Sequence, residues 1–227
     1  MMTIDLDKTE LRALNQALHD LGPDTNERHW RILNPRGKHS IAVGLNVPID
    51  VEIEGHVGYY CGGMNKAARI LVHGQAGKGL GENIMSGSIR VSGNVSECAG
   101  ASGHGGLIVI EGDASSRCGI SMKGVDIVVK GSVGHMSAFM AQAGRLVVCG
   151  DADHSLGDSI YEAELYVRGE VGSLGADCVE KAMTPAQREG LGALLAAAEV
   201  AHDPAEFRAY GSARKLYNFN IDHADAY

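Results

Sequence analysis

The chain has 227 residues, and its 20 basic against 28 acidic residues give a formal net charge of −8. This negative charge repels nucleic-acid phosphate and anionic lipid, so we expect neither nucleic acid nor membrane as a partner. Glycine supplies 31 residues and proline only 5, which excludes collagen and a disordered Pro/Gly linker. The glycine excess indicates that glycines are needed at fixed positions.

The targeting and redox signals predict a cytoplasmic protein. No apolar run approaches the ~20 residues of a membrane span, and Asp5, Asp7 and Glu10 occupy the place where a signal peptide needs lysines and then apolar residues. The cysteines are odd in number and form no CxxC pair, so we expect reduced thiols that serve as small apolar side chains. They are Cys61, Cys98, Cys118, Cys149 and Cys178.

Residues 1–34 predict a helical N-terminal extension. Leu11, Leu14, Leu18 and Leu21 form an apolar stripe at helical spacing, and the stripe stops at Gly22 and Pro23. Asp7 and Glu10 predict a start that resembles a capping box. The polar residues 24–47 predict an irregular segment, whose strand-like end SIAVGLNV (40–47) forms a partial first coil.

Residues 35–182 are dominated by a repeat of nineteen residues. The phrase apolar-x-apolar-x-Gly recurs seven times without an insertion. The residues two before each glycine are all β-branched, which favours a strand, and we expect them and the residues four before to point inward. We call the repeated glycines the anchor glycines: Gly55, Gly74, Gly93, Gly112, Gly131, Gly150 and Gly169.

Other positions of the repeat behave as consistently as the anchor. Two residues after each anchor, valine and alanine alternate from copy to copy, which predicts direct stacking of large on small side chains in a narrow interior. Small residues recur about seven and thirteen after the anchor, and they predict two further corners where a strand bends. Three short strands joined by three corners describe one coil of a parallel β-helix.

The predicted fold is therefore all-β: a right-handed parallel β-helix of about seven 19-residue coils over residues 35–182, with helical N- and C-terminal extensions. Left-handed hexapeptide solenoids need multiples of six residues per coil, and nineteen is not one, which favours the right-handed form. The end coils of a solenoid expose apolar surface and unpaired strand edges, so we expect the extensions to cap them.

Residues 183–227 predict a helical and aromatic C-terminal extension. Thr184, Pro185 and Gln187 form a helix start. The apolar face of that helix consists of Leu191, Leu194, Leu195 and Ala198. A second start at Asp203, Pro204 and Glu206 predicts a short helix that ends near Gly211, followed by an extended tail.

Aromatic residues gather in the last part of this extension. Either they fold back on the chain's own rod or they anchor another subunit, because aromatic residues and arginine are typical of binding hot spots. The candidate partner-binding residues are Phe207, Arg208, Tyr210, Arg214, Tyr217 and Phe219.

The search for chemistry gives no catalytic, cofactor-binding or metal residue. The glycine-rich strings at 77–81 and 100–106 occupy corner positions of the repeat and lack a following helix, so they are not phosphate loops. His135 and His154 are expected on adjacent coils without a third ligand. Asp113 and Asp151 are two coils apart, about 10 Å, too far for one shared ion. With Asp153 they are the nearest candidates for a polysaccharide-acting β-helix enzyme, which stays a weaker alternative.

The coils GLGENIMSGSIRVSGN (79–94), LIVIEGDASSRCGISMKG (107–124) and GDSIYEAELYVRGEVGSLGAD (157–177) resemble the GXGXG domain that closes the large subunit of glutamate synthase. The resemblance covers roughly residues 35–182 and implies a right-handed β-helix that carries no catalytic residue. A similar domain occurs in the C subunit of formylmethanofuran dehydrogenase, so the pattern is far more specific for the fold than for the complex.

As a separate chain with a helical front and an aromatic tail, the sequence is similar to the third subunit of the N-methylglutamate synthase family. That resemblance implies a non-catalytic scaffold between a glutamine amidotransferase-like subunit and an FMN-binding synthase-like subunit. The implied reaction joins methylamine and glutamate to give N-methylglutamate and ammonia. FMN and an iron–sulfur cluster are then expected on the partner subunit, and no cofactor on this chain. A subunit of another glutamate synthase or formylmethanofuran dehydrogenase-type complex is the alternative.

Overall fold

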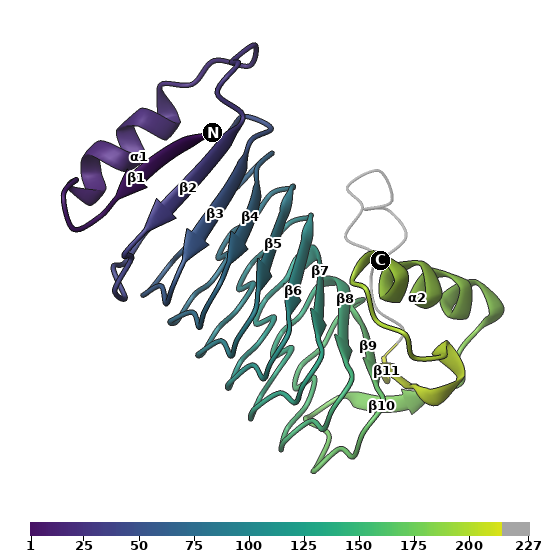
Figure 1. Ribbon diagram of the computed structural model, residues 1–227. Coiled ribbons are helices and arrows are strands. Elements are labelled where there is room, and N and C mark those ends of the chain that lie inside the picture. Colours follow the sequence, from purple (N-terminus) through teal and green to yellow (C-terminus); the bar gives the residue numbers. More distant parts are fainter. Residues whose placement is uncertain (215–227) are drawn as a thin grey trace, which may run out of the picture.

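The computed structural model describes residues 1–214, and over these residues one eleven-stranded sheet forms a side of a long rod (Figure 1). Strands β1 to β9 lie in chain order and pair in parallel, and β11 then inserts between β9 and β10. The strands are β1 (Met2–Asp5), β2 (His29–Leu33), β3 (Asp50–Glu54), β4 (Arg69–Val72), β5 (Ser88–Val91), β6 (Leu107–Ile110), β7 (Lys123–Val129), β8 (Ala143–Val148), β9 (Glu164–Val167), β10 (Cys178–Lys181) and β11 (Arg208–Ser212).

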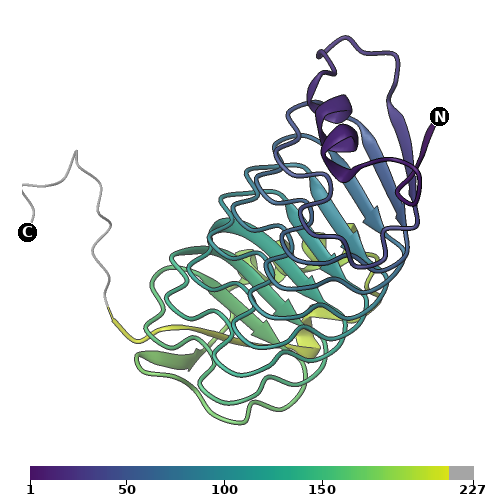
Figure 2. The same cartoon turned by 90° about the vertical axis from the view of Figure 1, so that its left-hand side faces the viewer.

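The repeat builds a parallel β-solenoid of about seven turns, in agreement with the predicted right-handed β-helix (Figure 2). From β3 to β9 each strand pairs with the strand one coil later, so that Val51 lies beside Ile70 and Ile70 beside Ile89. The residues four and two before every anchor glycine are fully buried, as predicted. The core is thus a column of stacked aliphatic side chains inside the rod.

Only one of the three strands predicted for each coil is a continuous strand. On the second side the valine–alanine column forms single bridges from Val57 through Ala76 and Val95 to Val171, which confirms the direct stacking of large on small residues. The third side consists of turns. We call this side the turn face, which comprises residues four to eleven after each anchor glycine.

The turn face has a regular left-handed backbone that the sequence did not predict. Residues five, seven and nine after the anchor have positive φ, as at Cys98 (61°), Gly100 (67°) and Ser102 (52°). Their N–H groups donate alternately to the next coil and the previous one: Cys98 to the Ser116 carbonyl and Gly100 to the Leu80 carbonyl. Coil-to-coil hydrogen bonding therefore continues on this side without a strand.

The anchor glycines serve a different purpose from the corner glycines. Most of them do not have a positive φ; the coils approach too closely there for a side chain. A Cβ built on Gly131 would lie 2.2 Å from an Asp113 carboxylate oxygen and 2.8 Å from the Gly112 carbonyl. Close approach of the neighbouring coil therefore requires glycine at the anchors, and a positive φ favours it at the corners.

The N-terminal extension differs from its prediction in four respects. Helix α1 (Leu11–His19) buries Leu14 and Leu18, but its N-cap residue Glu10 makes no side-chain capping bond, and the helix ends before Gly22. Strands β1 and β2 extend the sheet before residue 35, and β2 lies in the segment predicted to be irregular. The stretch 40–47 does join a coil, as turns rather than a strand; the Ile41 carbonyl accepts from the Gly62 N–H.

The C-terminal extension confirms the first predicted helix and corrects the second. Helix α2 (Pro185–Ala197) begins with a complete capping box between Thr184 and Gln187. The start at Asp203 leads only to a 3₁₀ turn (Pro204–Glu206), and the chain then forms β11 instead of continuing to Gly211 as a helix. Strand β11 pairs with the open edge of β9, which an end coil must cover.

Within the described residues, neither helix is long and apolar enough to cross a membrane.

Candidate functional site

The outer face of the sheet changes from mostly polar to apolar along the rod. Three residues before the anchor, this face carries Glu52, Leu71 and Arg90 on β3 to β5, but Val109, Val128, Val147 and Tyr166 on β6 to β9. The four apolar side chains are buried beneath Leu191, Leu194 and Leu195 of α2, together with Phe207 and Ala209, in a second hydrophobic cluster. The change from polar to apolar in this one column is a sequence signal for the cover, and it was not among the predictions above.

An ion-pair network fixes the end of α2 to the sheet. Glu111 binds both Arg90 and Lys130, with a Lys130 Nζ to carboxylate distance of 2.7 Å. Arg90 also donates to the Ala198 carbonyl at 3.2 Å and Lys130 to the Glu199 carbonyl at 3.3 Å. Cations beside a helix C-terminus complement its partial negative charge. Burial opposes ionisation of Glu111, but hydrogen bonds from Lys130 and Arg90 outweigh it and hold its pKa below the ordinary value.

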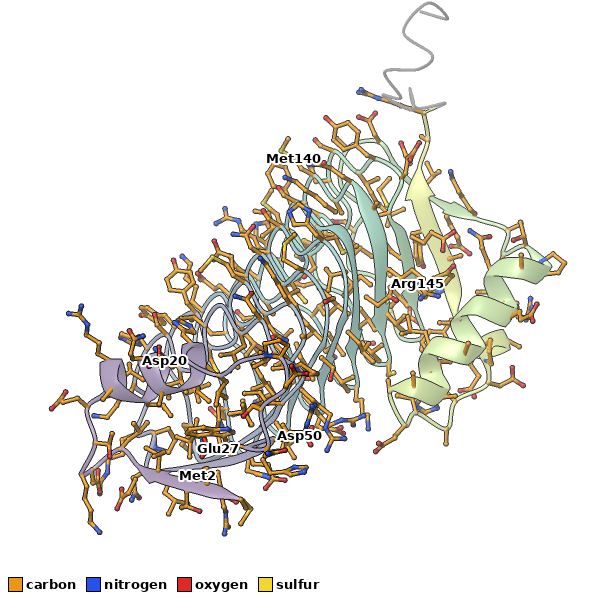
Figure 3. The ribbon with its side chains drawn as sticks, turned by 90° about the horizontal axis from the view of Figure 1, so that it is seen from above. Met2, Asp20, Glu27, Asp50, Met140 and Arg145 are labelled. Carbon is orange, nitrogen blue, oxygen red and sulfur yellow. The ribbon has the colours of Figure 1, made fainter. Side chains whose placement is uncertain are left out.

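A second bond set holds the middle of α2. Arg145 makes a bidentate ion pair with Asp126, with N–O distances of 2.8 and 2.5 Å, and donates to the Gly190 carbonyl at 3.1 Å. The Asp126 hydrogen bond is the main reason that the pKa of Arg145 is raised. Figure 3 shows Arg145 on the side of the rod that α2 covers. The cover is thus held by apolar packing and by charge-assisted hydrogen bonds.

A groove of about 320 Å³ lies where this cover ends, between β4 to β6 and the last turn of α2. Its lining combines Leu71 and Leu107 with Arg69 and Arg90. Both guanidinium groups are already paired, Arg69 with Asp50 at 3.0 Å and Arg90 with Glu111. The groove therefore offers a mixed contact surface and no free charge for chemistry.

One group of possible metal ligands occurs among the described residues and was not predicted. The ligand atoms of Glu52, Glu54 and His73 lie within 4.8 Å of one another on the outer face of β3 and at the end of β4. Arg31 already pairs with Glu54 at 2.8 Å, which balances the charge of that carboxylate. The group belongs to the charged, solvent-facing part of the sheet.

The predicted candidates for chemistry have structural partners. Asp113 accepts the Ser132 N–H at 2.8 Å, and Asp151 accepts the Glu170 N–H at 2.8 Å. This column of polar residues after the anchors is a hydrogen-bond ladder from coil to coil. His135 and His154 are exposed on adjacent coils, and neither belongs to a group of three possible metal ligands in the described chain.

The cysteines are dispersed in the rod. Four are buried, and Cys98 is partly exposed. Burial raises the pKa of Cys61 and of Cys118 to about 12, so these thiols stay protonated. The five sulfurs form no group of ligands, and the chain's thiols therefore do not fit an iron–sulfur cluster.

The candidate partner-binding residues divide between the chain's own core and its edge. Phe207 and Tyr210 fold back on the chain's own rod, where both side chains are buried. Arg208 donates to the Gly169 carbonyl at 2.6 Å, and Arg214 pairs with Asp177 at 2.6 Å. Tyr217 and Phe219 lie outside the described residues.

Comparison with known proteins gives one full-length relative of high similarity. The chain is 57% identical over 228 aligned residues to Protein GlxC of Rhizobium meliloti (strain 1021), and the alignment covers 100% of both chains. No family model matches the chain, and no solved structure matches it. At this identity, over the whole of both chains, the protein belongs to the GlxC family.

Proposed function

We propose that this chain is a non-catalytic structural subunit of a glutamate synthase-like complex. The observation that carries the proposal is a regular solenoid in which the candidate carboxylates and four of the five cysteines have structural places. Asp113 and Asp151 bond neighbouring coils, and the cysteines are dispersed and mostly buried. The resemblance of the coils to the GXGXG domain of glutamate synthase and the full-length similarity to GlxC both support this role.

A stacked solenoid suits the work of such a subunit. Two active sites that exchange a small intermediate such as ammonia must be held at a fixed distance and orientation. A flexible linker lets the distance vary, whereas a rod closed by coil-to-coil hydrogen bonds and a dense aliphatic core keeps it. We propose that the two sites belong to an amidotransferase-like subunit and an FMN-binding, iron–sulfur synthase-like subunit, and that both cofactors are held by the latter.

Co-purification tests this role. The chain is co-expressed with an amidotransferase-like and a synthase-like chain from the same organism, and the mixture is separated by size exclusion while protein and flavin absorbance are recorded. We expect one peak that contains all three chains and the flavin. A colourless, monomeric peak of this chain beside intact partners would refute the scaffold role.

The reaction we propose for the complex is the formation of N-methylglutamate from methylamine and glutamate. The assembled complex is supplied in parallel with methylamine and glutamate, and with glutamine and 2-oxoglutarate plus a reductant. N-methylglutamate in the first reaction supports the finer proposal. Glutamate formed only in the second assigns the subunit to a conventional glutamate synthase instead.

A further inference from the structure

Two carboxylates and one imidazole converge on the outer face of β3 and the end of β4. Glu52, Glu54 and His73 each offer one ligand atom, and the three atoms lie within 4.8 Å of one another. No other three possible metal ligands of the described chain come so close together. The imidazole distinguishes this set from an ordinary acidic surface, because its nitrogen is a ligand for transition metals, whereas Ca²⁺ and Mg²⁺ take oxygen ligands.

The sheet itself fixes the positions of the three side chains. Glu52 and Glu54 lie two residues apart on β3 and therefore share its outer face. Strand β4 pairs in parallel with β3, with Val72 beside Ile53, and the His73 N–H donates to the Ile53 carbonyl at 2.9 Å. His73 thus continues the register and lies beside Glu54, one coil later. Ligands carried by paired strands need little reorganisation to bind an ion.

The ligand atoms are not committed to other contacts. Arg31 reaches Glu54 from Nε at 2.9 Å and from Nη2 at 2.8 Å, and both contacts are to the same carboxylate oxygen, Oε1. The other oxygen, Oε2, is left for an ion. Within residues 1–214, the side chains of Glu52 and His73 make no hydrogen bond or ion pair. A hydrogen bond that holds one oxygen of a carboxylate orients the other, as the outer partners of metal ligands do.

The local charge also favours a divalent cation. The two glutamates carry two negative charges, and Arg31 is the cation that pairs with them among the described residues. Glu111 lies in the same column as Glu54, three coils later, and is a single carboxylate paired with both Arg90 and Lys130. The carboxylate there is neutralised by fixed cations, whereas the pair on β3 keeps one negative charge without a partner.

We propose that Glu52, Glu54 and His73 bind one zinc ion. Carboxylate oxygen and imidazole nitrogen are ordinary zinc ligands, and with three protein ligands water takes the fourth tetrahedral position. The ion joins β3 to β4 near the N-terminal end of the rod, whereas the apolar cover of α2 begins only at β6 (Figure 1). Its role is to stabilise the front coils, and it is independent of the proposed complex.

Calorimetric titration of the full chain tests the site. The purified protein is stripped with a chelator and titrated with Zn²⁺ and, in parallel, with Mg²⁺. We expect one zinc ion to bind per chain and Mg²⁺ not to bind at the same concentrations. Glu52→Gln and His73→Gln should each weaken zinc binding by about tenfold or more. Both substitutions lie on the surface, and circular dichroism checks that the variants keep the fold.

His154→Gln is the matched control. His154 is also exposed beside a carboxylate, with Asp153 at 3.7 Å, but it belongs to no group of three possible ligands in the part of the chain that the structure describes. This variant should bind zinc as tightly as the unaltered chain. Zinc should also raise the unfolding temperature of the unaltered chain and of His154→Gln, but not that of His73→Gln.

Three results would overturn the proposal. The first is that the unaltered chain binds no zinc, and the second is that Glu52→Gln and His73→Gln bind it unchanged. The third is that His154→Gln loses as much affinity as His73→Gln, which would show adventitious binding to surface histidines.

Discussion

Glycine at different positions of the repeat answers two separate physical demands. At the anchors the next coil leaves no room for a Cβ, and at the seventh position the backbone is left-handed. The two demands differ in severity. The seventh position carries alanine twice, at Ala138 with φ 58° and at Ala176 in the last coil, whereas all seven anchors are glycine. Steric exclusion by a neighbouring backbone is therefore the stricter of the two.

Gly100→Ala should lower the free energy of unfolding by about 1–2 kcal/mol. The cost arises from the left-handed φ of 67° and from a Cβ placed 2.5 Å from the tip of the Ile127 side chain. Urea denaturation measures it. Gly22→Ala is the control, since its Cβ meets nothing within 4 Å, and it should change stability by less than about 0.5 kcal/mol. Equal effects at both positions would show that the corner conformation is not under constraint.

At the scale of elements, α2 covers part of the outer sheet face and forms a second hydrophobic core with it. Its N-terminus is closed by a reciprocal capping box, and its buried leucines cover the valines of β6 to β8. A parallel sheet is commonly covered on both faces, and α2 supplies the second cover for the rear half of the rod. The front half keeps a polar outer face with ion pairs such as Arg31–Glu54.

Thr184→Ala should destabilise α2 by about 1 kcal/mol, because the Gln187 N–H loses its acceptor. Hydrogen exchange of the α2 amides measures the loss where it occurs, without requiring the rod to unfold. Thr184→Ser keeps the hydroxyl and should retain most of the protection. Serine and alanine variants that exchange equally fast would refute the capping contribution.

Glu111→Gln should make the protein less dependent on pH in the acid range. The folded pKa of Glu111 lies below its ordinary value of 4.5, so its stabilising contribution is present above that value and is lost as the pH falls through the folded pKa. We expect the variant to be less stable at neutral pH and to lose less stability on acidification. Unfolding free energies across the acid range measure this. Glu189→Gln, on the exposed side of α2, should leave the acid dependence unchanged.

At the scale of the whole molecule, the interior is filled by alternation along the rod axis. The bridge column runs Val57, Ala76, Val95, Ala114, Val133, Ala152 and Val171 without a break. Each small alanine leaves space beside it, and the larger valines of the coils above and below fill that space. The packing of every coil thus depends on its two neighbours, which makes the rod a cooperative unit.

Ala76→Leu should cost about 1–3 kcal/mol, because the extra methylenes have no space between Val57 and Val95. Gln75→Leu, one residue earlier and exposed, should change stability little. Thermal unfolding of the two variants makes the comparison. If the two substitutions are equally costly, the assignment of inward and outward columns is incorrect.

The nineteen-residue period alone predicted the solenoid, its buried columns and its corner glycines. Every coil of a regular solenoid needs apolar residues at the same inward positions and small residues at the same corners. The nineteen-residue period does not extend to the N-terminal end of the rod. Ile32 pairs with Ile53, twenty-one residues later, so the first coil does not follow the period and β2 carries no anchor glycine. The helix starts were readable because capping is local, and Thr184 and Asp203 both cap as predicted.

Only the tertiary structure decided the features that depend on neighbouring coils. The left-handed conformation at Tyr60, Met64 and Met140 is imposed by hydrogen bonds to adjacent coils, and these residue types carry no local signal for it. The direction of residues 208–212 was set by the open edge of β9, which pairs with a strand and not with a helix. The sequence by itself therefore determined the coil, and contacts between distant parts of the chain determined how its ends close and what its turn face exposes.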